Sequence, residues 1–436
     1  MSISRRLFLK NGAISLASIG MVGFGPSFLR STVLADTTAQ KRKKTLICIF
    51  QRGAADGLNI VVPHGDRDLY THRPGFAINR PSGSDPQAAL DLDGFFGLHP
   101  ALAPFLPIFK DGHLAAIQAC GSPDGTRSHF DAQDFMEAGA PGDKRVADGW
   151  LSRAVLACPE DRAKLAAASA FRAVAMGCDN GLPRSLQGDV AALAIPDLAS
   201  FGIGMKNLRG KQGAQAAAQS GAVDGFESIY TSAVGDVLHG TGQESFEAIA
   251  ALKKLSPGSY VPEHGAQYPN GRFGQSMRQV AQLIKADVGV EVAFAEMGGW
   301  DTHTQQQGRL NQQLREFGQG VSALYYDLGD RMSDVVILTM SEFGRTVRPN
   351  GTNGTDHGHA TCFFALGGEV NGGRVLGKWP GLAPEQLYEN RDLALTTDFR
   401  AVFGEVAQRH LGAEGLQKIF PGYTGTSADF RGVLRA

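Results

Sequence analysis

The chain has 436 residues, with 42 lysines and arginines against 43 aspartates and glutamates. This balance argues against a nucleic-acid partner, because duplex binders concentrate basic residues on one face, and the only dense basic run is residues 41–44. With 43% hydrophobic and 19% charged residues, the composition is typical of a globular protein. The length allows one large domain with insertions or two domains, and we expect one.

The N-terminus carries an export pattern. Arg5 and Arg6 precede an apolar run, residues 13–28, that glycines and a proline interrupt, so it is too short and broken for a membrane span. Val33-Leu34-Ala35 supplies the small residues of a cleavage site, which predicts a mature chain from Asp36 with 38 basic and 43 acidic residues and no stable span. The pattern predicts transfer by the twin-arginine export machinery to the periplasm or the outside. That route carries folded proteins, many of them with a bound metal or cofactor.

Apolar runs with strand character alternate with segments whose apolar residues recur at helical spacing. The expected strands are residues 45–50, 114–119, 171–176, 288–295, 335–340 and 362–366. The expected helices are residues 100–110, 130–138, 150–158, 272–285 and 307–328. This alternation predicts an α/β fold with a largely parallel central sheet and helices on both faces.

Residues 188–271 differ in composition from the rest of the chain. They are rich in Ala, Gln, Ser and Gly, with helical spacing at residues 226–238 and 246–255 and no convincing strand. We therefore expect a helical insertion at about 188–271. The loop 256–262 is then expected to close the edge of the sheet where the ligand binds.

Polar residues gather directly after the apolar runs, where a doubly wound sheet binds its ligand. The candidates in these segments are Arg52, Asp56, Ser128, Asp301, His303, Glu342, Arg345, Asp356, His357 and His359. Carboxylates and imidazoles in glycine-rich loops suit a divalent cation such as zinc, manganese or calcium. Asp301-x-His303 and His357-x-His359 are close enough for each pair to serve one metal cluster. Either pair alone could instead cap a turn.

Ser128, Arg52 and Arg345 each allow two interpretations. Ser128 opens an expected helix, where its hydroxyl is either a nucleophile near the positive helix end or an ordinary N-cap. Arg52 and Arg345 could clamp an anionic substrate, as a bidentate guanidinium does well, or form structural salt bridges. The sequence leaves both alternatives open.

The strand-end segments together resemble the exported family catalogued as domain of unknown function 1501, over nearly the whole mature chain. The segments that carry the resemblance are residues 50–59, 128–131, 299–303, 341–346 and 354–359. That family is grouped by similarity with the alkaline-phosphatase and sulfatase superfamily, whose members hold one or two metal ions beside a Ser, Thr or Cys nucleophile. The resemblance implies that Asp56 is the first metal carboxylate and Ser128 the nucleophile. It places Asp301 with His303 at the second metal and His357 or His359 as the final histidine ligand.

The chain departs from the superfamily pattern at two points. Ser341-Glu342 replaces an Asp-His pair, and His303 lies two residues after Asp301 where the superfamily has four. The resemblance implies a metal-dependent hydrolase of phosphate or sulfate esters, acting on a small anionic or polymeric ester substrate. The alternative is a non-catalytic exported binding or assembly protein on the same fold.

Overall fold

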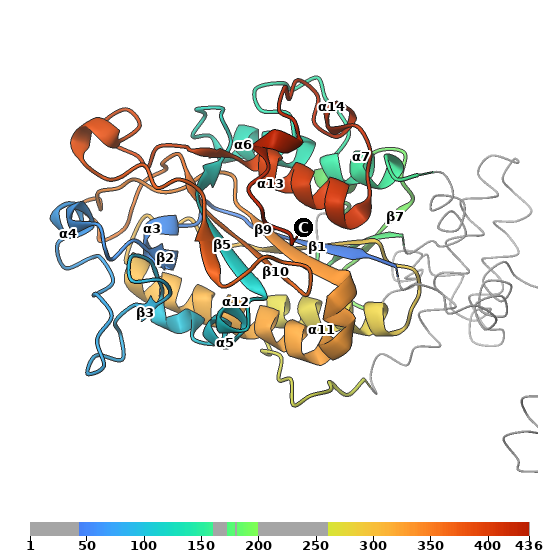
Figure 1. Cartoon of the computed structure of the whole chain (residues 1–436), viewed down its shortest axis with the longest axis horizontal. Helices are drawn as coiled ribbons and strands as arrows, with labels where there is room; N and C mark the ends of the chain where they lie inside the picture. The colour runs from blue at the N-terminus through green and yellow to red at the C-terminus, as the bar shows by residue number, and fades with distance from the viewer. Residues whose placement is uncertain (1–42, 160–171, 179–180, 199–259, 436) are drawn as a thin grey trace, which may run out of the picture.

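The computed structural model describes residues 43–159, 172–178, 181–198 and 260–435. The expected export signal and the expected insertion helices at 226–238 and 246–255 lie outside these residues. The described parts build a nine-stranded sheet with helices on both of its faces (Figure 1). The predicted α/β class with a mostly parallel sheet is confirmed.

The sheet has the strand order β11-β5-β10-β9-β1-β8-β6-β7, and β12 pairs with β5. The strands are β1 (Thr45–Gln51), β5 (Leu114–Gly121), β6 (Ala173–Met176), β7 (Ala192–Ile195), β8 (Val292–Met297), β9 (Val335–Met340), β10 (Thr361–Gly367), β11 (Arg374–Leu376) and β12 (Thr397–Asp398). Every pairing is parallel except those of β10, which runs antiparallel to both β5 and β9. The start of β10 therefore lies at the edge where β5 and β9 end.

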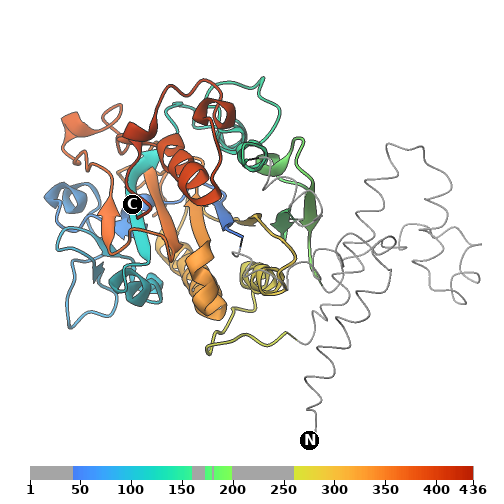
Figure 2. The same cartoon turned by 45° about the vertical axis from the view of Figure 1, so that its right-hand side comes forward.

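Two layers of helices cover the sheet (Figures 1 and 2). One layer contains α5 (Phe105–Lys110), α11 (Arg272–Lys285) and α12 (Gln306–Leu328). The other contains α6 (His129–Ala138), α7 (Trp150–Leu156), α13 (Phe399–Val406) and α14 (Leu416–Ile419). Both faces of the sheet are thus buried, which is why its central strands read as unbroken apolar runs.

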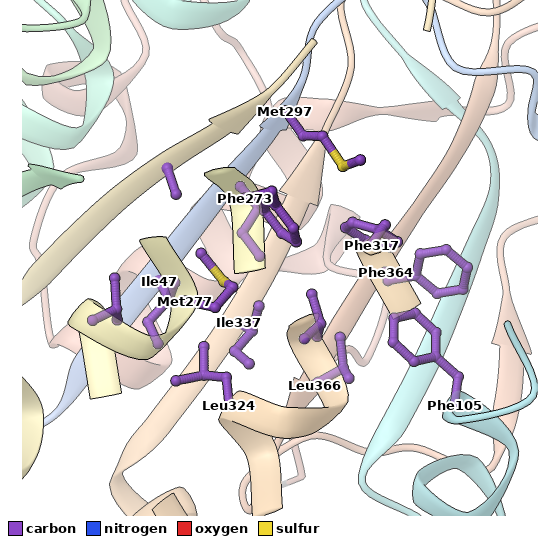
Figure 3. Close-up of a cluster of buried hydrophobic side chains, with 14 of the residues drawn as sticks. Ile47, Phe105, Phe273, Met277, Met297, Phe317, Leu324, Ile337, Phe364 and Leu366 are labelled. Atoms are coloured by element: carbon purple, nitrogen blue, oxygen red, sulfur yellow. The ribbon is translucent and has the colours of Figure 1, made fainter. Parts of the chain in front are cut away.

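The central strand β1 shows how one run supplies two cores. All seven of its residues are buried. Ile47 and Ile49 belong to the cluster under α11 and α12, which also contains Phe317 and Phe364 (Figure 3). Leu46 and the other alternate residues pack in the cluster on the opposite face. Successive strand side chains point to opposite faces, so the alternation follows directly from strand geometry.

A smaller antiparallel sheet lies beside the ligand edge of the main one, with the order β2-β4-β3. Its strands are β2 (Val61–Val62), β3 (Leu90–Asp91) and β4 (Gly97–Leu98). The short helices α3 (Gly57–Ile60) and α4 (Arg67–His72) precede and follow β2. These elements are short, and none was predicted from the sequence.

Two predicted elements differ from the structure for local reasons. The strand expected at 288–295 begins only at Val292, because Asp287 and Gly289 adopt positive φ angles of 53° and 93°, outside the extended region. The helix expected at 100–110 is split into a 3-10 turn, Pro100–Leu102, and α5. Pro104 lies between the two pieces and has no N–H to continue the helical hydrogen bonds.

Two expectations about residues 188–271 are wrong where the structure describes that stretch. Ala192–Ile195 form β7, an edge strand, although no strand was expected. The loop around Tyr260 does not close the ligand edge. The Tyr260 hydroxyl donates a hydrogen bond to Asp327, near the end of α12, at 2.7 Å. Because α12 leads into the start of β9, Tyr260 lies at the opposite edge of the sheet. Among the described residues, no helix is long and apolar enough to cross a membrane.

Candidate metal centre

Five chain segments meet at the edge of the sheet where β1, β5, β8 and β9 end. Four follow these strands, and the fifth, which contains His357, directly precedes β10. The antiparallel direction of β10 brings its beginning to the carboxyl ends of its neighbours. This arrangement brings together five of the candidate side chains, as their contacts show: Asp301, His303, Glu342, Asp356 and His357.

Three imidazoles converge on one carboxylate oxygen. The Nε2 atoms of His129 and His303 each lie 3.0 Å from Nε2 of His357. Oδ1 of Asp301 lies 3.5 Å from Nε2 of His129, 3.0 Å from Nε2 of His303 and 3.3 Å from Nε2 of His357. We call these four side chains the imidazole cluster. One ligand atom from each of His129, Asp301 and His357 lies within 4.8 Å of the other two.

The other ring nitrogen of each histidine contacts an acceptor. Nδ1 of His129 lies 2.7 Å from Oε1 of Glu342, and Nδ1 of His303 lies 2.9 Å from Oδ1 of Asp356. Nδ1 of His357 lies 2.8 Å from the carbonyl oxygen of Arg127. Ionised carboxylates and carbonyls only accept hydrogen bonds, so each Nδ1 carries a hydrogen, and a ring without a second proton points an Nε2 lone pair at the common centre.

In this centre all three Nε2 atoms lie 3.0–3.5 Å from Oδ1 of Asp301, and Nε2 of His357 lies 3.0 Å from each of the other two. Lone pairs at that distance repel unless a shared proton or a cation lies between them. Three imidazole nitrogens and one carboxylate oxygen form a donor set that fits a borderline divalent ion. The side chains are also partly open, with 27% of His129, 40% of His303 and 43% of Asp301 exposed.

The charges around the cluster shift its pKa values in opposite directions. The hydrogen bond that His129 donates to Glu342 is the largest cause that raises the pKa of His129, whereas burial is the largest cause that lowers the pKa of His357. Burial works to raise the pKa of Asp301. The hydrogen bond and charge of Arg345 outweigh burial, so the Asp301 pKa lies below its ordinary value. The Asp301 carboxylate is therefore ionised near neutral pH.

Local structure fixes the position of each histidine. His129 is the first residue of α6, and its ring stacks on buried Phe343 at 4.9 Å. His357 lies opposite Arg345 in a short antiparallel bridge. Gly53 has a φ of +118°, and a Cβ there would lie 2.7 Å from the backbone nitrogen of Asp301. Only glycine lets the turn after β1 pack so closely against the segment that carries Asp301.

Glu342 is a buried anchor under the cluster. Its side chain is fully buried, and Oε1 accepts hydrogen bonds from Nδ1 of His129 at 2.7 Å, from the Gly53 N–H at 2.8 Å and from Nε2 of Gln133 at 2.8 Å. Burial works to raise the pKa of Glu342, but the hydrogen bonds of His129 and Gln133 leave it below its usual range. The structure thus places Glu342 behind an imidazole, on the far side from the shared centre. Asp356 takes the equivalent position behind His303.

The two candidate arginines are both in ion pairs. Nη1 of Arg345, whose side chain is fully buried, donates to Oδ1 of Asp301 at 2.6 Å. Arg52 pairs with Glu296 and Glu137 and donates to Gln133 at 3.0 Å. Arg345 therefore forms a structural salt bridge and also places a positive charge beside the cluster. The charge of Arg52 is instead balanced by the carboxylates of Glu296 and Glu137.

Besides Arg52, three further candidates are not brought into the cluster among the described residues. Asp56 is buried, and its carboxylate accepts two hydrogen bonds from Arg73, at 2.7 and 3.0 Å. His359 stacks on Tyr388 with ring centres 4.2 Å apart, and burial lowers its pKa.

Ser128 is the third. It is exposed and caps α6, its hydroxyl accepting from the backbone nitrogen of Asp131 at 3.4 Å. This is the N-cap arrangement that the sequence left open.

His129 is the cluster residue that the sequence analysis did not select. The signal was present, because His129 follows Ser128 within a segment that carries the family resemblance. Gln133, one turn later on α6, was missed as well, and it links Glu342 to Arg52. The N-terminal half of α6 therefore contributes to the site through the ring of His129 and the side-chain amide of Gln133.

The fold and the cluster together define an α/β protein with a histidine- and carboxylate-lined centre at the carboxyl edge of a mostly parallel sheet. Residues 239–419 match the model of the family described as "Protein of unknown function (DUF1501)", which confirms the family resemblance for that part of the chain. No curated protein matches the chain.

A solved structure, the crystal structure of the PsFucS1 sulfatase from Pseudoalteromonas sp., is similar to this chain at 12% identity and a TM-score of 0.38. The match covers 94% of this chain and 76% of that one. A likeness at this TM-score is too weak to carry an argument about fold or activity.

Proposed function

We propose that this protein is a metal-dependent hydrolase of phosphate or sulfate esters, and that the imidazole cluster holds the metal. The observation that carries the proposal is the convergence of three Nε2 atoms, each with its Nδ1 anchored, on Oδ1 of Asp301. Nitrogen donors outnumber oxygen donors, which favours zinc over manganese and calcium, because those two ions prefer oxygen ligands. A bound cation would act as a Lewis acid that stabilises charge on the oxygens of the ester.

The exposure of the cluster supports a catalytic over a structural role. Four protein ligands would complete a tetrahedral site, so catalysis needs a fifth coordination position, and the partly exposed side chains leave the centre accessible to substrate. Here the side chains of Asp301 and His303 are 43% and 40% exposed. Arg345 lies behind Asp301 and fixes its carboxylate, and its charge also favours an anionic substrate.

Ser128 is the nucleophile that we propose for the reaction. Its exposed hydroxyl lies one residue before His129, at the N-terminus of the ten-residue helix α6. In the proposed step, Ser128 Oγ bonds to phosphorus or sulfur and loses its proton to water, while the bond to the leaving oxygen breaks and the alcohol departs with a proton from water. Water then cleaves the Ser128 ester, which releases phosphate or sulfate.

The proposal is tested by metal analysis and by hydrolysis of p-nitrophenyl phosphate and p-nitrophenyl sulfate. We expect the purified protein to hold about one equivalent of a divalent metal and His357→Ala to hold less than about a tenth. His113→Ala is the matched control, because His113 directly precedes β5, at the opposite edge of the sheet. Metal-free protein after supplementation, or metal in both variants, would refute the metal centre.

Ser128→Asn separates the cap from the nucleophile, because asparagine caps helices as well as serine does but offers no hydroxyl. We expect this variant to keep its unfolding midpoint and to lose at least about 100-fold in kcat. Full activity in Ser128→Asn would show that water attacks the ester directly. Metal binding without hydrolysis of either ester would favour the non-catalytic alternative.

A further inference from the structure

Two adjoining clefts lie next to the imidazole cluster and share one wall. One has a volume of about 420 Å³ and the other about 480 Å³. Both are lined by Pro74, Gly75, Gln307 and Gly308. We call the two together the amide trough. It runs between the loop after α4 and the first turn of α12.

The first cleft connects the amide trough to the cluster. Asn350 lines this cleft, and its Nδ2 donates to the carbonyl oxygen of His303 at 2.9 Å and to Oδ1 of Asp356 at 3.1 Å. Gln305, two residues after His303, lines the same cleft. A ligand lying in the trough would therefore reach the loops that carry His303 and Asp356.

The lining of the trough mixes polar and apolar groups and is almost without charge. Its carboxamides include Asn59, Gln87, Gln305, Gln307, Asn311 and Asn350. None of the described residues that line it is Asp, Glu or Lys. Arg73, which also lines it, is neutralised by its bidentate pair with Asp56. Burial lowers the pKa of His99, in the same wall, to about 4, so this ring is neutral near pH 7.

One buried polar atom in the wall lacks a partner. Asn59 is 1% exposed, and its Oδ1 makes no hydrogen bond to any described residue. A buried acceptor left unsatisfied costs roughly 1–3 kcal/mol, so a ligand donor that reaches this closed-off oxygen after a small shift of the wall would recover part of that cost. Tyr70 adds an aromatic ring to the same cleft.

We propose that the amide trough binds a neutral, hydroxyl-rich glycan chain and presents an ester carried by that chain to the imidazole cluster. Each sugar hydroxyl both donates and accepts, and a carboxamide offers both a donor NH2 and an acceptor oxygen. A charged polymer would need opposite charges, which the trough lacks. A peptide bound by strand addition would need an open strand edge, and the trough is built from turns and a helix end.

This inference rests on the proposed function for the ester step, but glycan binding is measurable without it. The probe is an array of neutral oligosaccharides with their sulfated and phosphorylated counterparts, used with the full purified protein. We expect wild-type protein to bind a subset of the neutral oligosaccharides. We expect His357→Ala to bind the same subset, because the trough does not use His357.

Gly308→Trp fills the trough with little risk to the fold, since a Cβ at Gly308 meets nothing within 4 Å. We expect this variant to bind the same oligosaccharides at least about tenfold more weakly, with its metal content unchanged. Arg309→Trp is the matched control, because Arg309 is the next residue of α12, is exposed and lines neither cleft. It should bind like wild type.

The outcomes separate the two proposals. No oligosaccharide bound by wild-type protein, or equal binding by Gly308→Trp, would overturn the glycan inference, whatever the result for p-nitrophenyl esters. Binding of peptides in place of glycans would overturn it as well. Glycan binding by a protein that holds no metal would support the glycan inference and refute the proposed metal-dependent hydrolase.

Discussion

Replacing Glu342 by glutamine tests whether this buried carboxylate sets the metal affinity of the cluster. Oε1 of Glu342 holds Nδ1 of His129 at 2.7 Å and also accepts from Gly53 and Gln133. Glutamine has the same shape, and its oxygen can accept the same three hydrogen bonds. The substitution therefore removes the negative charge while the position of the His129 ring is kept.

The expected magnitude follows from the role of the carboxylate behind an imidazole ligand. Such partners raise the basicity of the ring, and their loss costs about 10–100-fold in metal affinity, which corresponds to about 1.4–2.7 kcal/mol. The hydrogen bond of Glu342 is the largest cause of the raised pKa of His129, so its charge is felt strongly at that ring. We expect Glu342→Gln to fall within this range.

The assay is competition for zinc and manganese with a chelator of known affinity, at one pH and one ionic strength. Glu405→Gln is the matched control, because Glu405 is an equally buried glutamate that accepts from the backbone nitrogens of Arg431 and Leu434, outside the imidazole cluster. It should lower the unfolding midpoint and leave metal affinity unchanged. Metal affinity within about twofold of wild type in a folded Glu342→Gln protein would contradict our reasoning.

Two further predictions concern the packing of Gly53 under the cluster and the ion pair between Glu369 and His410. Gly53→Ala would place a Cβ 2.7 Å from the nitrogen of Asp301 in a left-handed backbone, so we expect a loss of about 1–3 kcal/mol in urea unfolding together with weaker metal binding. Gly298→Ala, where a Cβ meets nothing within 4 Å, should stay within about 0.5 kcal/mol, and equal effects of both changes would contradict the close-packing argument. The hydrogen bond from His410 is the largest cause that lowers the pKa of Glu369, from 4.5 to about 2. A carboxyl group whose pKa is lower in the folded than in the unfolded state stabilises the fold at pH values above its unfolded pKa. This stabilisation is lost as the pH falls from about 4.5 toward 2. We therefore expect Glu369→Gln to reduce the urea midpoint at pH 7 but to change it little at pH 2. An equal loss at both pH values would show that the negative charge of Glu369 is not the source of the stabilisation.

The sequence predicted the central elements of the fold because each has a local cause. The run from Thr45 is apolar throughout, as a strand buried on both faces must be. The expected helix 272–285 matches α11, because its apolar residues recur at helical spacing over four turns. Residues such as Ala192–Ile195 and Val61–Val62 were missed, because strands of two to four residues carry too few positions to show a period.

The sequence by itself also determined which kinds of side chain gather after the strands, because polar residues and glycines there stand out against apolar runs. It did not determine which of them meet. Asp56 and Asp301 both follow parallel strands, yet one carboxylate binds Arg73 and the other joins the imidazoles. The choice depends on partners far away in the chain, which no local pattern reports.

The direction of β10 was decided only by tertiary structure. Had this strand been parallel to β9, His357 would lie at the opposite edge of the sheet, and the cluster could not form. Its pairing with β5 and β9 is antiparallel, and this brings His357 within 3.0 Å of His129 and of His303. Strand direction is set by pairing between distant segments, so the sequence supplied the ligand types and the sheet topology supplied the site.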